Sequence, residues 1–166
     1  MSTSAPFRMP VMDPCHFCEI ISGREAQWNV LHKTPLTVTL LNGRQFEIGQ
    51  CMVMPIRHAP TLLDLTEAEG AAIMVAARQA AEVLVKAFAP EGVLLYQNNG
   101  VGSGQEVPHF HLHVVPRQPG SDWGLGPPHI ARLEQGGNRP PQLDHDAVTE
   151  AKLETTRTLR SHYQQL

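Results

Sequence analysis

The chain has 166 residues, a size typical of one domain built around one hydrophobic core. Its 42% hydrophobic and 17% charged residues exclude the disordered and fibrous classes. The formal net charge is −3 and Lys and Arg form no cluster, which excludes a protein that binds nucleic acid duplexes through basic contacts. Any phosphate ligand must therefore be held by local geometry.

The sequence shows no segment typical of membrane insertion or secretion. No stretch approaches about 18 consecutive apolar residues, and residues 1–14 contain no apolar run of signal-peptide length. We therefore expect a cytoplasmic protein without a membrane partner. Residues 1–14 also lack hydrophobic periodicity, which is typical of an N-terminal tail.

Short β-rich runs alternate with turn signals through much of the chain. Asn42-Gly43 is the strongest of these turn signals, because both residues readily adopt the backbone conformations that hairpin turns require. The predicted strands cover residues 30–32, 36–41, 51–55, 93–96 and 110–115.

One long helix is predicted in the middle of the chain. Thr66 and Glu69 form a capping box, in which each side chain can bond a backbone amide of the first turn. Apolar residues then recur at helical spacing until Pro90 and Gly92 end the pattern. A helix over residues 67–88 follows from these signals.

Two further helices complete the expected fold. Residues 19–22 are predicted to form a short helix that stops at Gly23, and residues 144–164 a C-terminal helix capped at Asp144. Hairpins with helices between and after them favour an α+β fold with a central, mainly antiparallel sheet.

Three histidines occur at every second position, starting one residue before the last predicted strand. Successive side chains of a strand point to opposite faces, so the histidines share one face and the apolar residues between them the other. The histidines are His109, His111 and His113, and the apolar residues are Phe110, Leu112 and Val114. Because neutral imidazole suits nucleophilic attack, proton transfer and metal ligation near neutral pH, this row predicts one of these tasks.

A glycine-rich stretch at residues 98–105 precedes the histidine row. Its three glycines within five residues allow backbone amides to approach an anion closely, because glycine adopts the conformations that build a concave nest of N–H groups. The stretch is therefore a candidate phosphate-binding loop.

Residues 104–117, which read GQEVPHFHLHVVPR, resemble the signature of the histidine-triad (HIT) family of nucleotide hydrolases and transferases. Other segments fall in that family's order, namely residues 17–21, 41–42, 49–50 and 53–58. The resemblance implies an α+β fold, a homodimer, and cleavage of phosphorus bonds next to AMP or GMP. It also implies a catalytic domain over residues 15–118, on which a C-terminal loop and helix over residues 119–166 pack.

The resemblance further implies roles for individual residues. His111 is similar to the family's nucleophile, which forms a covalent nucleotidyl-histidine, and His113 to the group that orients and stabilises the phosphate. His113 favours hydrolysis over hexose-phosphate transfer, since transferases tend to carry Gln there. The residues similar to substrate contacts are Asn42 (ribose), Asn98, Gly104 and Gln105 (phosphate region), and Phe17, Ile20 and Leu40 (base).

Glu106 departs from the family pattern, in which Ser or Thr often stands at this position and donates to phosphate. An acidic side chain repels a phosphate anion. Either Glu106 faces away from the site, or the phosphate contact is lost.

Cys15 and Cys18 form a C-x-x-C pair that suits zinc, because such a turn places two thiolates on one metal ion. A thioredoxin-like redox pair is the alternative, but its usual βαβ context is missing. In zinc-containing family members, the other two ligands stand at positions similar to those of His58 and His109. Four protein ligands make a closed structural site, so the expected cofactor is structural zinc.

Two rival functions stay open at this point. In the first, all three triad histidines bind a catalytic metal, which leaves Cys15, Cys18 and the glycine-rich stretch without a task. In the second, the protein is a nucleotide sensor or a zinc-stabilised interaction module without catalysis, against which the intact His111 counts.

Overall fold

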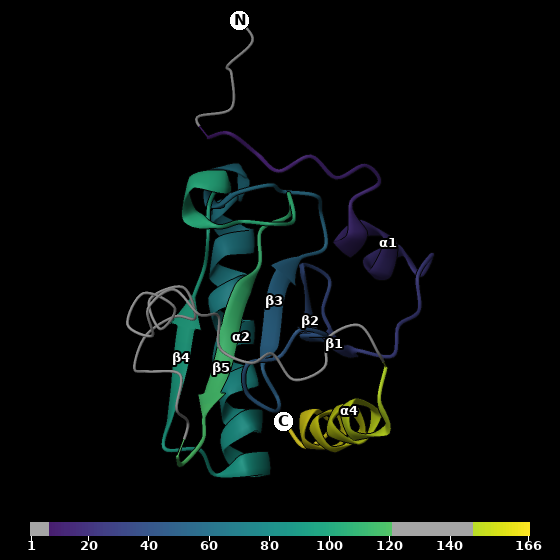
Figure 1. Ribbon diagram of the computed structural model, residues 1–166, viewed down its shortest axis with the longest axis vertical. Coiled ribbons are helices and arrows are strands. Elements are labelled where there is room, and N and C mark those ends of the chain that lie inside the picture. The colour runs from purple at the N-terminus through teal and green to yellow at the C-terminus, as the bar shows by residue number, and fades with distance from the viewer. Residues whose placement is uncertain (1–6, 121–147) are drawn as a thin grey trace, which may run out of the picture.

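The computed structural model describes residues 7–120 and 148–166. Within them, five strands form one antiparallel sheet in the order β1-β2-β3-β5-β4 (Figure 1). The strands are β1 (Val30–Lys33), β2 (Thr37–Leu41), β3 (Cys51–Pro55), β4 (Gly92–Tyr96) and β5 (Leu112–Arg117). The α-helices are α1 (His16–Ser22), α2 (Glu67–Phe88) and α4 (Glu150–Tyr163), with short 3-10 turns at Leu62–Asp64 and Val101–Ser103. The predicted α+β class with a central antiparallel sheet is confirmed.

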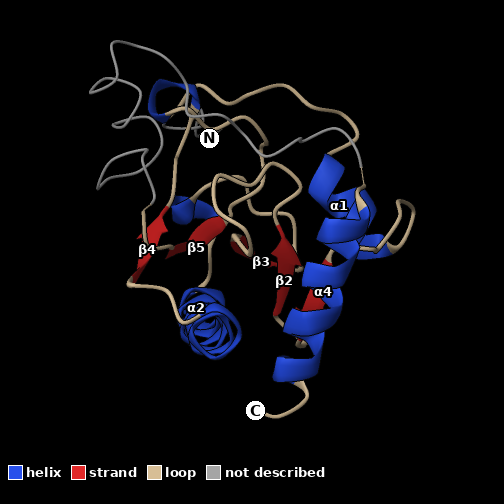
Figure 2. Cartoon of the chain, turned by 60° about the horizontal axis from the view of Figure 1, so that its bottom comes forward, coloured by secondary structure: helices blue, strands red, loops and turns tan. Residues whose placement is uncertain are grey.

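The two faces of the sheet carry separate cores, because alternate residues of a strand point to opposite sides. In β3, Cys51 and Val53 pack with α2, whereas Met52 and Met54 pack with α1. Cys51 is only 1% exposed and is a small buried residue of this core. Figure 2 shows α2 nearly end-on beneath the strands and α4 at the β1 end, so that the two helices share this face of the sheet.

The helix α2 begins and ends where the sequence predicts. The Thr66 hydroxyl accepts a hydrogen bond from the Glu69 amide at 3.2 Å, and the Glu69 carboxylate accepts one from the Thr66 amide at 2.9 Å. Ala89 adopts the left-handed conformation after the last turn, with φ of 46°, and Pro90 prevents continuation.

Glu69 also fixes the segment that follows β3. The Arg57 guanidinium donates two hydrogen bonds to its carboxylate, at 2.9 and 2.7 Å, and a third to the backbone oxygen of Asp64 at 2.7 Å. Glu69 is 5% exposed, and the Arg57 guanidinium is the main cause that holds the pKa of its carboxyl at about 2. The start of α2 is thus bound to the residue next to His58.

The C-terminal helix is shorter than predicted. It begins at Glu150, and its cap is Thr149, whose hydroxyl accepts from the Lys152 amide at 3.3 Å. The predicted cap, Asp144, lies outside the described residues. The Arg160 guanidinium donates to the backbone oxygens of Gln27, Trp28 and Val30, at 2.7 to 3.2 Å. The helix therefore holds in place the segment that leads into β1.

Four other elements start at residues different from those predicted. The strands β2 and β4 begin at Thr37 and Gly92 rather than at residues 36 and 93. The helix α1 begins at His16 rather than at residue 19, with Cys15 at its N-cap position. The last strand begins at Leu112 rather than at Phe110, since the amide of Phe110 donates to Ala59 outside the sheet, at 2.6 Å. The first two triad histidines therefore precede the strand.

Within the described part of the chain, no helix is both long enough and apolar enough to cross a lipid bilayer. The outer side of α2 nevertheless exposes more than half of Met74, Val75 and Val85. Leu95 of the edge strand β4 is 42% exposed.

Replacement of Glu69 by Gln should lower the free energy of unfolding by about 1–3 kcal/mol at pH 7, because it removes a buried, charge-assisted pair with Arg57. The pKa of Glu69 is about 2 in the folded protein and near its ordinary value when unfolded. Its carboxylate therefore stabilises the fold above about pH 4.5, and this stabilisation is lost as the pH falls toward 2.

Urea denaturation at pH 7 and at pH 3 measures this effect. Glu67→Gln, which changes an exposed acid in the same helical turn, is the control and should change stability by only a few tenths of a kcal/mol. An equal loss for Glu69→Gln at both pH values would contradict the assignment.

Candidate functional site

The row of histidines divides its side chains between two faces as predicted. Phe110 and Val114 are buried against α2, and Leu112 packs on the same core. On the other face, the rings of His111 and His113 lie 5.0 Å apart between centroids at an angle of 79°, and both line a cavity. Apolar packing behind the row thus holds two imidazoles toward the cavity.

This cavity has a volume of about 820 Å³ and lies between α1, the β2–β3 loop, the glycine-rich stretch and α4. Its size fits a small-molecule ligand such as a mononucleotide. Most of the predicted site residues line it, namely Phe17, Ile20, Asn42, Asn98, Gly104, His111 and His113.

Leu40 and Gln105 do not line this cavity. Leu40 is fully buried in the core between the sheet and α1, together with Phe17 and Ile20. The Gln105 side chain accepts from the Gly100 amide at 2.6 Å and donates to the backbone oxygens of Pro60 and Val107. It therefore holds the glycine-rich loop in shape from behind.

The glycine-rich loop needs glycine at two positions. Gly100 and Gly104 have φ of +77° and +84°, which side chains disfavour. A Cβ at Gly100 would also lie 2.7 Å from that of Phe7. The N-terminal tail passes there, and the backbone oxygen of Arg8 accepts from the Val101 amide at 2.8 Å.

His111 has its tautomer set by the backbone. Its Nδ1 lies 2.7 Å from the backbone oxygen of His109. A carbonyl oxygen only accepts hydrogen bonds, so Nδ1 carries the hydrogen and Nε2 keeps its lone pair. Burial lowers the pKa of His111, against smaller raising effects of this hydrogen bond and of Glu106. His111 is therefore neutral near pH 7, with a nucleophilic nitrogen.

His113 has the opposite tautomer, and Gln50 sets it. The oxygen of the Gln50 side chain accepts from the Phe46 amide at 2.9 Å, so its nitrogen faces Nδ1 of His113, at 3.2 Å. That nitrogen donates, which leaves the hydrogen of the imidazole on Nε2. Burial lowers the pKa of His113 well below its ordinary value. His113 thus offers a neutral N–H donor.

The sequence alone does not point to two residues that position His113. Gln50 is fully buried, and Tyr96 stacks on the His113 ring at 4.3 Å between centroids and 13° between planes. Both become neighbours of His113 only through strand pairing, because Met52 and Tyr96 are the residues opposite His113 in the sheet.

Glu106 lines the cavity and does not face away from it. Its carboxylate oxygen lies 3.4 Å from a guanidinium nitrogen of Arg44, and both side chains are more than half exposed. The pair joins the β2–β3 loop to the glycine-rich loop at the edge of the cavity. The backbone amide of Arg44 in turn donates to the side chain of Asn42, at 3.0 Å.

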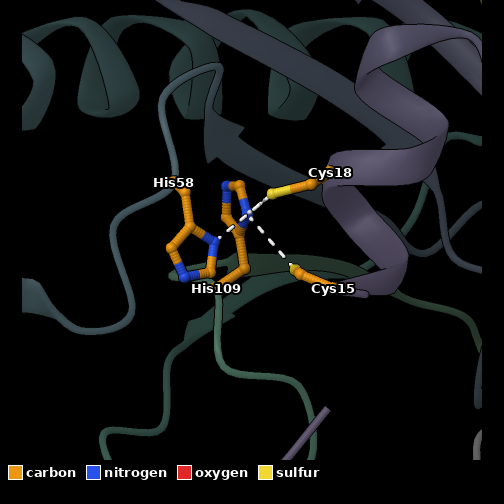
Figure 3. Close-up of side chains that lie close together, drawn as sticks. All are labelled: Cys15, Cys18, His58 and His109. Atoms are coloured by element: carbon orange, nitrogen blue, oxygen red, sulfur yellow. Dashed lines mark hydrogen bonds between the residues drawn. The ribbon is translucent and has the colours of Figure 1, made fainter. Parts of the chain in front are cut away.

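A second cluster, on the α1 side of the sheet, includes His109, the first histidine of the row. The ligand atoms of Cys15, Cys18, His58 and His109 all lie within 4.8 Å of one another (Figure 3). The sulfur of Cys18 lies 3.3 Å from Nδ1 of His58 and 3.5 Å from Nδ1 of His109, and the sulfur of Cys15 lies 3.8 Å from the latter. Ligands of a tetrahedral zinc ion are separated by about 3.3–3.8 Å, given its usual bond lengths. The four residues therefore fit zinc.

His109 is prepared as a ligand by its tautomer and its burial. Its Nε2 donates to the backbone oxygen of Pro55 at 2.9 Å, which leaves the lone pair on Nδ1, toward the two cysteines. The side chain is fully buried, and this burial is the main cause that lowers its pKa to about 4. His109 stays neutral at pH 7, as metal ligation requires.

Comparison with known proteins places the chain in a family. A model of the HIT domain matches residues 23–120, which is more than half of the chain. The chain belongs to the HIT domain family. The HIT signature predicted from residues 104–117 is thereby confirmed at the level of the family.

Individual relatives of this HIT protein are hydrolases. It is 33% identical over 89 residues to the asymmetrical bis(5'-nucleosyl)-tetraphosphatase of Schizosaccharomyces pombe, an alignment that covers 54% of this chain and 49% of that protein. It is 31% identical over 112 residues to adenosine 5'-monophosphoramidase hnt1 of the same yeast, with 68% and 80% covered. The chain thus spans about half the length of the first relative.

A solved structure of similar fold is that of a zinc-bound histidine triad family protein from Mycobacterium smegmatis. The TM-score is 0.70 at 24% identity, with 92% of this chain and 94% of the other covered. At this identity the likeness supports the fold.

The tautomers of His111 and His113 in this HIT protein can be measured by ¹⁵N NMR near pH 7.5. His111 should show a protonated Nδ1 and a bare Nε2, and His113 the reverse, because each tautomer is fixed by one hydrogen bond. Gln50→Leu should abolish the preference of His113 and leave that of His111 unchanged. A His113 spectrum that does not respond to this substitution would show that Gln50 does not set the tautomer.

Proposed function

We propose that the protein hydrolyses a phosphorus bond next to AMP or GMP through a covalent nucleotidyl-histidine at His111. One observation carries the proposal: the lone pair of His111 Nε2 lies in a nucleotide-sized cavity beside the N–H donor of His113. Nucleophile and donor are both neutral and held in place by hydrogen bonds, as covalent catalysis requires.

The reaction has two steps. In the first, the Nε2 lone pair forms a bond to the α-phosphorus, and the bond from phosphorus to the leaving group breaks. The leaving group departs with that electron pair and takes a proton from solvent. In the second step, water attacks the phosphorus and gives up a proton, and the bond to Nε2 breaks. Nucleoside monophosphate and neutral His111 result.

The walls of the cavity match the parts of a nucleotide. Phe17, Ile20 and Met52 form an apolar end suited to the base, and Asn42 is the candidate ribose contact. Asn98 and Gly104 border the two histidines, where backbone and amide donors can bind phosphate oxygens. Within this proposal, Leu40 and Gln105 support the site without contacting the ligand.

The relatives support this reaction class. One is named a tetraphosphatase that acts on dinucleoside compounds and another a monophosphoramidase. Both names describe hydrolysis at phosphorus beside a nucleoside. We therefore propose nucleoside phosphoramidates or dinucleoside polyphosphates as the substrates of this chain.

Substitution of His111 by Ala should lower kcat roughly a thousandfold or more while AMP still binds, since the change removes the nucleophile and leaves the other contacts. His113→Ala should have a smaller effect. With α-labelled substrate, mass spectrometry of acid-quenched and base-quenched samples should find an acid-labile, base-stable adduct on His111.

Near-normal turnover by His111→Ala would contradict the proposal, as would an adduct on another residue. His32→Ala is a matched control, because His32 stacks on Tyr163 and does not line the cavity.

The rival with a catalytic metal on all three histidines has less support. Among the described residues, the group of atoms that could hold one ion includes His109 with two cysteines and His58, and neither His111 nor His113. The second rival, a nucleotide sensor or interaction module without catalysis, predicts that wild type shows no turnover in the same assay.

We also propose that Cys15, Cys18, His58 and His109 bind one zinc ion. Four protein ligands leave no open position for substrate, so the ion would supply structural stability rather than chemistry. It would hold α1, which carries Phe17 and Ile20, against the end of the histidine row.

Elemental analysis should find one zinc ion per chain, and chelation should lower the melting temperature, because structural zinc contributes on the order of 10 kcal/mol. Cys18→Ser should lose the ion. Cys51→Ala is the control and should keep it, since Cys51 lies in the core beneath α2. A preparation without metal that melts normally would exclude the zinc site and leave the hydrolase proposal unaffected.

The exposed apolar residues of α2 support the homodimer that the family resemblance implies. Met74, Val75 and Val85 are each more than half exposed on one helix. We propose that a second copy of the chain covers them.

A further inference from the structure

The Arg44–Glu106 ion pair lines the solvent-exposed edge of the cavity next to the glycine-rich stretch. His111 is 8% exposed and lies at the inner end of the site. In an in-line displacement the leaving group points away from the attacking nitrogen, and therefore toward the open edge of the cavity. Glu106 lines that edge two residues after Gly104, and its ion pair partner Arg44 faces it from the β2–β3 loop.

The other acidic and basic residues that line the cavity within residues 7–120 and 148–166, Glu25 and Lys152, lie at its opposite end. Glu25 precedes β1, and Lys152 belongs to α4, which packs on β1. The strand order places β1 at one edge of the sheet, three positions away from β5, which carries His113. Among the described residues that line the cavity, Glu106 and Arg44 are thus the charges nearest to the reacting end.

We propose that the Arg44–Glu106 pair determines the leaving-group specificity of the site. The carboxylate disfavours polyphosphates and other anionic leaving groups and favours amines that carry a positive charge. The preferred substrate class is then a nucleoside 5'-phosphoramidate of a cationic amine. This inference rests on the proposed function.

The geometry gives the two residues opposite effects. The carboxylate repels a negatively charged leaving group, and Arg44 attracts one but is partly neutralised by Glu106 at 3.4 Å. Loss of the carboxylate removes the repulsion and also releases the guanidinium. Loss of the guanidinium leaves the carboxylate uncompensated.

His111 Nε2 bonds to phosphorus as the P–N bond breaks, and the nitrogen departs with the electron pair. It takes one proton from solvent to become the neutral amine and a second to become an ammonium ion. Glu106 stabilises this cation by charge alone.

Three AMP phosphoramidates that differ only in the charge of a primary alkyl amine test the inference: those of ethylenediamine (cationic), propylamine (neutral) and β-alanine (anionic). For wild type, kcat/KM should fall in that order. Glu106→Gln should raise the ratio of anionic to neutral substrate roughly three- to tenfold, and Arg44→Gln should lower it by a similar factor. Both effects should shrink from 50 to 500 mM salt, because the pair is exposed.

Glu91→Gln is the matched control. It removes one exposed acidic charge at the far end of β4, next to the residue that pairs with Arg117, and should leave all ratios unchanged. If Glu106→Gln changes kcat/KM of the three phosphoramidates by one common factor, Glu106 has only a structural role and the inference is wrong.

Binding of the same three phosphoramidates to the His111→Ala variant separates this inference from the proposed function. Calorimetry should show that affinity falls in the same order, from the cationic to the anionic phosphoramidate. Adding Glu106→Gln should raise the affinity for the anionic compound relative to the neutral one, and adding Arg44→Gln should lower it, even if wild type turns over none of the three. Charge-independent binding would overturn the inference.

Discussion

The hydrogen bond between the His109 backbone oxygen and Nδ1 of His111 is the contact on which the rest of the site depends. At 2.7 Å it fixes which nitrogen of His111 keeps a lone pair. His109 is itself held on two further sides, by its Nε2 on the Pro55 carbonyl and by its Nδ1 beside Cys15 and Cys18. Because one fully buried residue belongs to both clusters, any force that moves the cysteine cluster also moves the acceptor that orients His111.

This arrangement explains why two imidazoles two residues apart have opposite tautomers. His111 bonds to a backbone carbonyl, which can only accept, whereas His113 bonds to a side-chain nitrogen of Gln50, which can only donate. The Gln50 amide is oriented in turn by the Phe46 amide. Burial then lowers both pKa values, so that neither ring is protonated near neutral pH. One ring offers a lone pair and its neighbour a hydrogen.

Short-range signals in the sequence predicted the parts of the structure that short-range forces decide. The capping box and Pro90 are local signals that define the two ends of α2. The alternation of histidines with apolar residues along residues 109–114 distinguishes the side chains of the site from those of the core. The contacts of Gln50 and Tyr96 with His113 depend instead on strand register, and the Arg44–Glu106 pair joins residues 62 positions apart. Register and loop proximity come from the assembled sheet, so no local pattern reveals them.

Leu40 shows the same limit within one strand. All five residues of β2 are buried, so its sequence does not reveal which side chains reach the cavity and which lie beneath it. The start of α4 shows a limit of local signals as well. Asp144 and Thr149 are both residue types that cap helices, and Thr149 is the cap of α4, whose Leu159 and Tyr163 lie in the core with α2.

Buried neutral groups and exposed charged groups have different roles in this site. A charge on His111 or His113 would have to be desolvated, which costs several kcal/mol, so the reacting groups are neutral and oriented by hydrogen bonds. Exposed charges such as Arg44 and Glu106 cost little to keep, because water solvates them, and their influence on any one ligand is correspondingly modest. The chemistry is therefore built into the inner wall of the cavity, where substitution disturbs packing. Selection between leaving groups lies at the edge, where single charges can change without altering the fold.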